Sequence, residues 1–193
     1  MTTAAEPSIH RVDGSDRMCF VNDAWLAFAL ENGATGLARE SVLGRPIWDF
    51  IEGREVAYLF RALLREVRNR RRELRLPFRC DAPATRREMR LDLVPLPAGV
   101  IEFRSHLEVQ TSRELVALLD PAVARASWHV PICSWCKRVE VSGGTWEDTE
   151  TAAQVMGLLA SATAPRLMHT ICPDCLAAIR GQSGIDVPPL DKM

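Results

Sequence analysis

Several features that define large classes of protein are missing from this 193-residue sequence. No apolar run approaches the roughly 18–20 residues that cross a bilayer, and the first eight residues lack the basic and apolar regions of a secretion signal. The sequence contains no glycine-rich phosphate-binding loop, and no carboxylate pair or Ser/His/Asp set indicates hydrolysis. We therefore expect a cytoplasmic protein without a membrane partner, and we predict that it is not an enzyme.

An excess of charge of either sign is also missing. The 24 Lys and Arg residues nearly balance the 25 Asp and Glu residues, for a formal net charge of −1. This balance gives no general reason to expect a polyanionic partner. The one dense basic run contains Arg68, Arg70, Arg71, Arg72 and Arg75. Because a helix dipole favours cations at the C-terminus, and no aromatic residue is interleaved to stack on bases, we interpret this run as a solvated helix end.

Four of the six cysteines form a pattern. Residues 133–136 (the first cysteine turn) and residues 172–175 (the second cysteine turn) are both C-x-x-C. This spacing lets one tight turn aim two thiolates at one metal ion, and two such turns complete the tetrahedral four-thiolate shell that Zn²⁺ prefers. The sequence therefore predicts a structural Zn²⁺ site with Cys133, Cys136, Cys172 and Cys175 as ligands. A closed shell of this kind has no open position for catalytic water.

The same cysteines allow other interpretations. C-x-x-C is also the spacing of redox dithiols, so the cysteines could be redox-active instead of structural. An iron–sulfur cluster or free thiols are further alternatives, whereas covalent haem attachment is excluded because neither pair is followed by His. Lys137 and Arg138 could offset the negative charge of the shell. His169 could replace a ligand, donate a hydrogen bond to one, or be a partly exposed strand residue. Cys19 and Cys80 are expected to be small buried thiols.

Residues 9–106 are patterned as an α+β domain. Two short strands, 9–13 and 17–21, are expected before a helix that Asn22 can cap. Period-two alternation predicts strands in 74–80, 89–93 and 100–105, and Pro77 places the first of these at an edge or a bulge. Between the two groups of strands, residues 54–72 are predicted to form a long helix. Its apolar stripe contains Val56, Leu59, Phe60, Leu63, Leu64 and Val67.

Val21-Asn22-x-Ala24-Trp25, then Leu43-Gly44-Arg45, and then a helix and three strands resemble a PAS domain of bacterial signalling proteins. This resemblance implies a five-stranded antiparallel sheet with helices on one face, which enclose a pocket for a cofactor or small ligand. The predicted helix 54–72 contains no His that could hold haem, and no Asn-Cys-Arg-Phe-like segment could form a flavin adduct. We therefore expect an unidentified ligand that is colourless or held without a covalent bond, or an empty pocket, and the cofactor-binding residues are unknown.

The second half of the chain is expected to contain short helices around the cysteines. An apolar stripe at Leu115, Leu118 and Leu119 predicts a connector helix over 112–119. Residues 139–141 are expected to form a strand, a capping box at Thr145 to open a helix that runs to about residue 160, and residues 175–180 to form a helix that ends at Gly181. The stretch Ile-Cys-x-x-Cys-Lys-Arg at 132–138, followed by His-x-Ile-Cys-Pro-x-Cys at 169–175, resembles a cysteine-rich extension found beside PAS and receiver domains.

These patterns divide the chain into five parts: a disordered tail (1–8), a PAS-like sensory domain (9–107), a connector (108–128), a small four-cysteine zinc-binding module (129–181) and a loose C-terminal tail (182–193). The leading hypothesis is a sensory or adaptor protein of bacterial signal transduction with no output enzyme. Its partner would be another signalling protein, and a homodimer through the connector helix is weighed against a passive packing helix in a monomer. The second hypothesis is a thiol redox switch, and the weakest is a nucleic-acid-binding transcriptional regulator.

Overall fold

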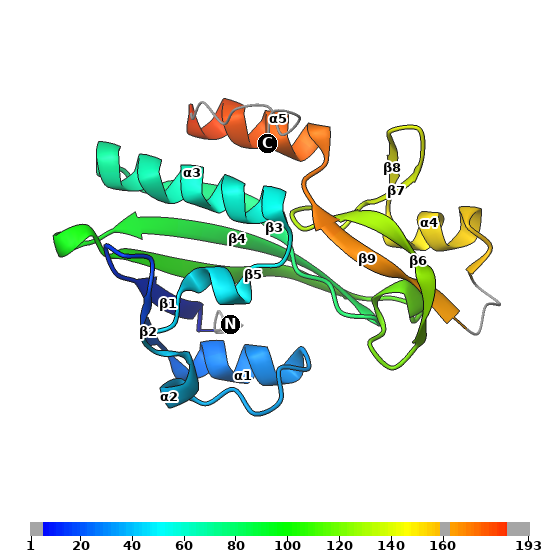
Figure 1. The fold of residues 1–193 in the computed structure, drawn as a ribbon, viewed down its shortest axis with the longest axis horizontal. Helices are drawn as coiled ribbons and strands as arrows, with labels where there is room; N and C mark the ends of the chain where they lie inside the picture. The colour runs from blue at the N-terminus through cyan, green and yellow to red at the C-terminus, as the bar shows by residue number, and fades with distance from the viewer. Residues whose placement is uncertain (1–5, 159–162, 185–193) are drawn as a thin grey trace.

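The computed structural model describes residues 6–158 and 163–184, and these form an α+β fold with two sheets (Figure 1). The expected tails lie mostly outside the described residues, but Ser8 already belongs to the first strand, and Gln182 to the last helix. Within the part of the chain that the structure describes, no helix combines the length and the apolar character needed to span a membrane.

The first sheet has five antiparallel strands in the order β2-β1-β5-β4-β3, which confirms the predicted five-stranded antiparallel sheet. Its strands are β1 (Ser8–Val12), β2 (Met18–Val21), β3 (Leu74–Arg79), β4 (Thr85–Pro95) and β5 (Ile101–Ser112). β4 and β5 form a long hairpin around the 3₁₀ turn η2 (Pro97–Gly99). β3 lies at an edge of the sheet, where the missing N–H of Pro77 costs no ladder hydrogen bond.

Helices cover one face of this sheet. They are α1 (Asp23–Glu31), α2 (Arg39–Val42), the 3₁₀ helix η1 (Ile47–Phe50) and α3 (Arg54–Arg70). The Asn22 side chain caps α1 by accepting a hydrogen bond from the Trp25 N–H at 2.9 Å, as predicted. The apolar stripe of α3 is buried against the sheet at Val56, Leu59, Leu63, Leu64 and Val67. The helix is therefore stabilised by packing of its apolar face against the inner face of the sheet.

The second sheet was only partly predicted. Its order is β8-β7-β6-β9, with β6 (Ala124–Cys133), β7 (Val139–Ser142), β8 (Thr145–Glu147) and β9 (Thr163–Thr170). β6 and β9 pair in parallel, with Ile132 opposite His169 and Cys133 opposite Thr170. The helices α4 (Thr149–Val155) and α5 (Pro173–Ser183) complete this half of the chain, and α5 returns to lie alongside α3 (Figure 1).

The predicted connector helix over 112–119 is wrong. β5 continues to Ser112 because it stays paired with β4, and only Ala117–Leu119 form a short 3₁₀ turn, η3. Leu115 has 61% of its surface exposed, whereas Val116 and Leu118 are buried. The apolar stripe proposed for a dimer is therefore absent. The Arg113 and Val116 N–H groups donate to the Ala84 and Pro83 carbonyls at 3.0 and 2.9 Å, and these non-local hydrogen bonds override the weak local helix pattern.

The predicted helix from Thr145 to about residue 160 is also wrong at its start. Thr145–Glu147 form β8, which pairs with β7 across a turn at Gly143 and Gly144. Both glycines have positive φ, as a two-residue hairpin turn requires. α4 begins only after Asp148, and residues 159–162 lie outside the described part. The last helix is longer than predicted, because Pro173 opens it and Gly184, rather than Gly181, ends it.

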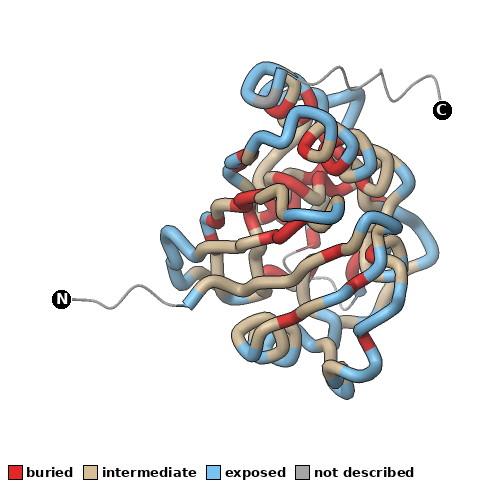
Figure 2. Tube along the Cα trace, turned by 90° about the vertical axis from the view of Figure 1, so that its left-hand side faces the viewer, coloured by how far each residue is buried: buried red, intermediate tan, exposed pale blue. Residues whose placement is uncertain are grey.

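Two groups of buried side chains hold the molecule together. The larger group lies between the first sheet and its helices, and it also contains Cys133, Trp135, Cys172, Leu176 and Ile179. Figure 2 shows the buried segments gathered in the interior, with exposed chain around them. The smaller group lies between the second sheet, η3 and α4. Its members are Val116, Leu118, Val130, Ile132, Val139, Ala152, Ala153 and Leu158.

Candidate metal centre and adjoining cavity

The four predicted ligands converge on one point. The Sγ atoms of Cys133, Cys136, Cys172 and Cys175 all lie within 4.8 Å of one another, so this cluster could hold a metal ion. A tetrahedral shell with metal–sulfur bonds of about 2.3 Å separates its sulfurs by about 3.8 Å. The Sγ atoms of Cys136 and Cys172, one from each turn, are 3.7 Å apart. All four are free thiols, and their spacing fits a metal-sized centre.

Strand pairing sets the positions of the two cysteine turns. Cys133 ends β6, and Cys172 follows β9 by two residues, so the parallel register places them side by side. The Ser134 N–H continues the pairing by donating to the Thr170 carbonyl at 2.8 Å. Cys172 is then the N-cap of α5, where its sulfur accepts from the Cys175 N–H at 3.4 Å.

Backbone amides and nearby cations support negative charge on the sulfurs. The Cys172 N–H donates to Cys133 Sγ at 3.3 Å, a contact that orients and stabilises a metal-bound thiolate. Arg138 forms an ion pair with Asp174 at 3.0 Å, which links the two turns. Burial alone would lower the pKa of Arg138, but the charges of Cys136 and Cys172 and of nearby carboxylates raise it. Lys137 Nζ, by contrast, donates to the Ser134 carbonyl at 3.1 Å.

The thiols do not share protons equally. Hydrogen bonds from Cys136, Cys172 and Cys175 lower the pKa of Cys133, while hydrogen bonds from Cys133 and its neighbours raise the pKa of Cys175. The hydrogen bond with Cys133 raises the pKa of Cys136, but hydrogen bonds with Cys172 and Cys175 lower it overall, so the first cysteine turn carries the thiols that lose their protons more readily. A metal cation can replace those protons, since metal binding to thiols releases protons. The donor set therefore fits a thiophilic ion such as Zn²⁺.

His169 is not one of the four converging ligands. Its Nε2 lies 3.2 Å from a Glu52 carboxylate oxygen, and its Nδ1 lies 3.0 Å from the Ser134 hydroxyl. Burial lowers the pKa of His169, and the Lys137 charge adds to this effect, although Glu52 opposes it. Because a carboxylate only accepts hydrogen bonds, Nε2 carries the ring proton. Nδ1 then accepts the hydroxyl proton of Ser134.

The Ser134–His169–Glu52 series was missed at the sequence level, because its members are distant in the chain and no spacing rule links them. It follows the order of a nucleophile, base and orienting acid. However, the Glu52 side chain is 81% exposed, so water competes for its hydrogen bonds. The clearest structural role is to fix the first cysteine turn to the segment that leads into α3. Gly53 supports this contact, because the His169 backbone leaves no room for a Cβ there.

Trp135, which sequence analysis did not single out, ties the first cysteine turn to the first sheet. Only 6% of its surface is exposed. Its indole N–H donates to the Pro77 carbonyl at 2.6 Å, and its own carbonyl accepts from the Arg79 N–H at 2.7 Å. Its ring packs between Phe60 of α3 and Phe78 of β3, with centroid separations of 5.9 and 6.2 Å. The turn therefore continues the open edge of β3.

An inner cavity of about 270 Å³ lies between the first sheet and its helices. Most of its lining is apolar or aromatic, with His10, Ser105 and Ser134 as its polar residues. The full lining is His10, Met18, Trp25, Ile47, Phe50, Ile51, Val56, Phe60, Phe78, Leu91, Phe103, Ser105, Ser134 and Trp135. The first cysteine turn thus contributes two adjacent residues to the wall.

The inner cavity has no charge of its own among the described side chains that line it. Its titratable group, His10, stacks on Phe103 with ring centroids 4.3 Å apart and an interplanar angle of 22°. Burial lowers the pKa of His10 to about 4, so the ring is neutral at physiological pH. A charged molecule would lose its hydration in this cavity without gaining a counter-ion.

Trp135 also lines a second space, which shares Trp135 and Phe78 with the inner cavity. This sulfur-side hollow, of about 320 Å³, is lined by Trp135, Phe78, Cys136 and Cys175, together with residues of β4 and α5. Cys136 and Cys175 are half-buried, whereas Cys133 and Cys172 are buried. The hollow is therefore a route by which a metal ion or small reagent can reach two of the four sulfurs.

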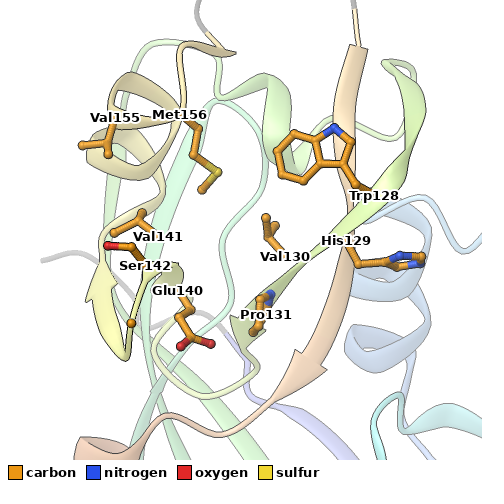
Figure 3. Close-up of a pocket in the computed structure, with 10 residues that line it drawn as sticks. Trp128, His129, Val130, Pro131, Glu140, Val141, Ser142, Val155 and Met156 are labelled. Carbon is orange, nitrogen blue, oxygen red and sulfur yellow. The ribbon is translucent and has the colours of Figure 1, made fainter.

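A larger outer hollow of about 570 Å³ lies on the second sheet, between β6, β7 and α4 (Figure 3). Trp128 and Met156 lie on opposite sides of it, and His129 points away. Trp128 is 47% exposed. None of the four clustered cysteines lines this hollow, and Glu140 is occupied by the Gly144 N–H at 3.0 Å. The cysteine cluster therefore adjoins the inner cavity and the sulfur-side hollow, and not the outer hollow.

The remaining candidate residues are Cys19, Cys80 and the basic run, and none of them belongs to the four-cysteine cluster. Cys19 is exposed, which corrects the expectation of a buried thiol, because its side chain faces away from the core on edge strand β2. Cys80 is half-buried. In the basic run, Arg68 pairs with Asp16 at 2.7 Å, Arg70 pairs with Glu66, and Arg75 pairs with Glu73. These ion pairs fit the interpretation of the basic run as a solvated helix end.

No protein-family model and no curated protein matches this sequence. The geometry of the four cysteines and of the inner cavity therefore provides the indications of function.

Proposed function

We propose that this protein is a PAS-like sensory or adaptor protein, in which the inner cavity binds a small ligand and the four cysteines hold a structural Zn²⁺ ion. The observation that carries the proposal is the inner cavity, because it has the place and the lining of a small-molecule site. The protein passes its signal to another signalling protein and has no output enzyme of its own. It acts in the bacterial cytoplasm.

Support for the PAS-like part comes from the first sheet. Five antiparallel strands with helices on one face match what the resemblance implied, and the inner cavity lies where those helices meet the sheet. The lining includes Trp25, one of the residues on which the resemblance was based. Self-association remains a prediction from the resemblance alone, since the connector helix that was to carry it is not formed. Light scattering at micromolar concentration tests it.

Support for zinc comes from the donor set and its surroundings. Four thiolates favour Zn²⁺ over hard cations, which prefer oxygen ligands. The amide–sulfur contact to Cys133 and the Arg138–Asp174 pair stabilise the negative charge that such a shell would carry. When bound, the ion would cross-link the two turns. Its role would be structural, since a full thiolate shell leaves no open position for water.

Metal analysis and absorbance of the purified full-length protein test this proposal. We expect one zinc ion per chain under reducing conditions and no Soret or flavin band. Cys136→Ser should reduce zinc retention, whereas Cys19→Ser should not, because Cys19 is remote from the cluster. Detection of iron together with a charge-transfer absorption band would indicate an iron–sulfur centre instead of a zinc site. Fully folded protein without any metal would contradict the structural role.

A thiol redox switch is the second candidate, and the sulfur-side hollow favours it. Cys136 and Cys175 are accessible from this hollow, and the Sγ atoms of Cys136 and Cys172 are already 3.7 Å apart. Two thiolates, hydrogen peroxide and two protons would yield one disulfide and two water molecules, with release of the metal. Stoichiometric zinc release at low peroxide, reversed by a thiol reductant, would favour the switch. Retention of zinc under the same conditions would favour the structural role.

A further inference from the structure

The first cysteine turn is part of the wall of the inner cavity, so one stretch of four residues contains both candidate metal ligands and cavity-lining side chains. Ser134 and Trp135, which line the cavity, stand between the sulfur-bearing Cys133 and Cys136. Trp135 lines both the inner cavity and the sulfur-side hollow, as does Phe78. Any change that moves the sulfurs therefore moves the cavity wall.

The cavity lining restricts the chemistry of the ligand. Apolar cavities of about 150 Å³ bind benzene, and drug-sized ligands occupy about 300–1,000 Å³, so about 270 Å³ suits one or two fused rings. Aromatic side chains around the cavity favour an aromatic guest through offset or edge contacts. The uncharged lining disfavours an ion.

Ser134 adds a directional requirement. Its hydroxyl proton is directed to His169 Nδ1, because Nε2 of that ring donates to Glu52. The Ser134 oxygen therefore keeps lone pairs for a donor in the cavity. A ligand with one N–H or O–H group would satisfy it, whereas a purely hydrocarbon ligand would not.

We propose that the inner cavity binds a compact, neutral, aromatic molecule with one hydrogen-bond donor, and that the four-cysteine centre controls its affinity through Trp135. The inference rests on the proposed function and specifies its regulation. The structure places Trp135 between Phe60 and Phe78, and a bound metal would fix the turn and hold the ring there. Without metal the turn loses its cross-link and the wall loosens. By thermodynamic reciprocity, the ligand must then strengthen metal binding by the same factor.

Calorimetric titration with three probes tests the ligand class. Indole is neutral with one donor, toluene is neutral without a donor, and benzoate is anionic. On the zinc-loaded full-length protein, we expect indole to bind about 2–10-fold more tightly than toluene, the range of one hydrogen bond, and benzoate to bind most weakly. Ser134→Ala should remove the preference for indole over toluene. Equal or tighter binding of benzoate would overturn the neutral class.

The coupling is tested by removing zinc with a chelator. We expect indole affinity to fall about tenfold, within the usual range for coupled sites, and zinc affinity, measured against a chromophoric chelator, to rise by the same factor at saturating indole. Equal indole affinity with and without zinc would overturn the coupling and leave the proposed ligand site standing. No binding of any probe to the zinc-loaded protein would overturn the ligand site itself, and with it the proposed function.

A variant that keeps all four metal ligands tests whether Trp135 carries the coupling. Because Trp135 itself lines the inner cavity, Trp135→Leu should weaken indole binding whether or not zinc is bound. It should also abolish the roughly tenfold effect of saturating indole on zinc affinity, because the wall that links the two sites is changed. Trp128→Leu is the matched control, since Trp128 lies on the outer hollow and should keep that effect. A roughly tenfold effect that persists in Trp135→Leu would overturn the role of Trp135.

Discussion

The two sheets of this protein are stabilised by cores of different size. Both contain pairings between strands that are far apart in the chain, β1 with β5 in the first sheet and β6 with β9 in the second. The first sheet also buries the large apolar side chains of α3, whereas the smaller group of buried side chains at the second sheet includes two alanines of α4. A small core leaves little margin of stability.

The comparison explains where the cysteines lie. They follow the ends of the second sheet, but the side chains next to them, such as Trp135 and Ile179, are buried in the core of the first. A metal ion at this junction would tie the less stable sheet to the more stable one. The four-cysteine part therefore shares its core with the first sheet, and loss of metal should affect both.

The largest expected effect is that of the metal. Cys133→Ser removes a buried ligand, and metal binding in small zinc domains contributes on the order of 10 kcal/mol to folding. We expect loss of zinc and a large drop in melting temperature, with a change in the environment of the buried Trp135. Calorimetry with near-UV circular dichroism measures both. Cys19→Ser, at an exposed thiol, is the matched control. An unchanged first sheet in the zinc-free variant would show that the two sheets are independent.

A smaller effect is expected from the charged network between the end of the first sheet and α4. The Asp81 carboxylate is fully buried and binds Arg79 and Arg113, which also reach Asp148 and Glu150 of the α4 start at 2.6 Å each. Asp81→Asn leaves buried guanidinium groups partly unpaired, so we expect a loss of about 3–5 kcal/mol of unfolding free energy.

Chemical denaturation measures this loss, and the exposed Asp23–Arg39 pair is the control. Asp23→Asn should cost about 0–1 kcal/mol, because 94% of the Asp23 side chain is exposed. Equal effects of the two variants would mean that the buried network does not join the sheet to α4.

Core truncations compare the two sheets directly. Leu63 of α3 and Leu118 of η3 are both fully buried, one in each core. Replacement of either by Ala should cost about 2–5 kcal/mol. If the sheets unfold together, both variants shift one cooperative transition. A separate early transition in Leu118→Ala alone would instead show that the second sheet unfolds by itself.

The smallest effect depends on pH. Burial lowers the pKa of His10 to about 4 in the folded protein, against about 6.5 in an unfolded chain. The unfolded state therefore binds more protons between these values, so stability is full above about pH 6.5 and falls as the pH drops towards 4, by at most about 3 kcal/mol. His10→Gln should flatten the dependence between pH 7 and 5, measured by denaturation. His129→Gln, at an exposed histidine, should leave the pH dependence of stability unchanged. An equally flat profile in His129→Gln would contradict the assignment of this dependence to His10.

Local patterns were enough to predict much of the first sheet. The apolar stripe of α3, the Asn22 cap and the period-two alternation of β3 and β4 are contained in short stretches of sequence. The four ligands were predicted for the same reason, since each C-x-x-C turn is local and a thiophilic metal needs two of them.

The tertiary structure alone decided the rest, because it depends on residues far apart in the chain. β6 has a weak apolar pattern and becomes a strand only through its pairing with β9. The 112–119 segment does not form its predicted helix, because Ser112 pairs with β4 and the Arg113 and Val116 N–H groups donate to carbonyls in the turn before β4. Ser134, His169 and Glu52 meet although no spacing rule connects them. Trp135 became a cavity wall because strand β3 had an open edge to which the cysteine turn could bind. Pairing and burial of this kind are set by the whole fold, and so no local stretch of sequence encodes them.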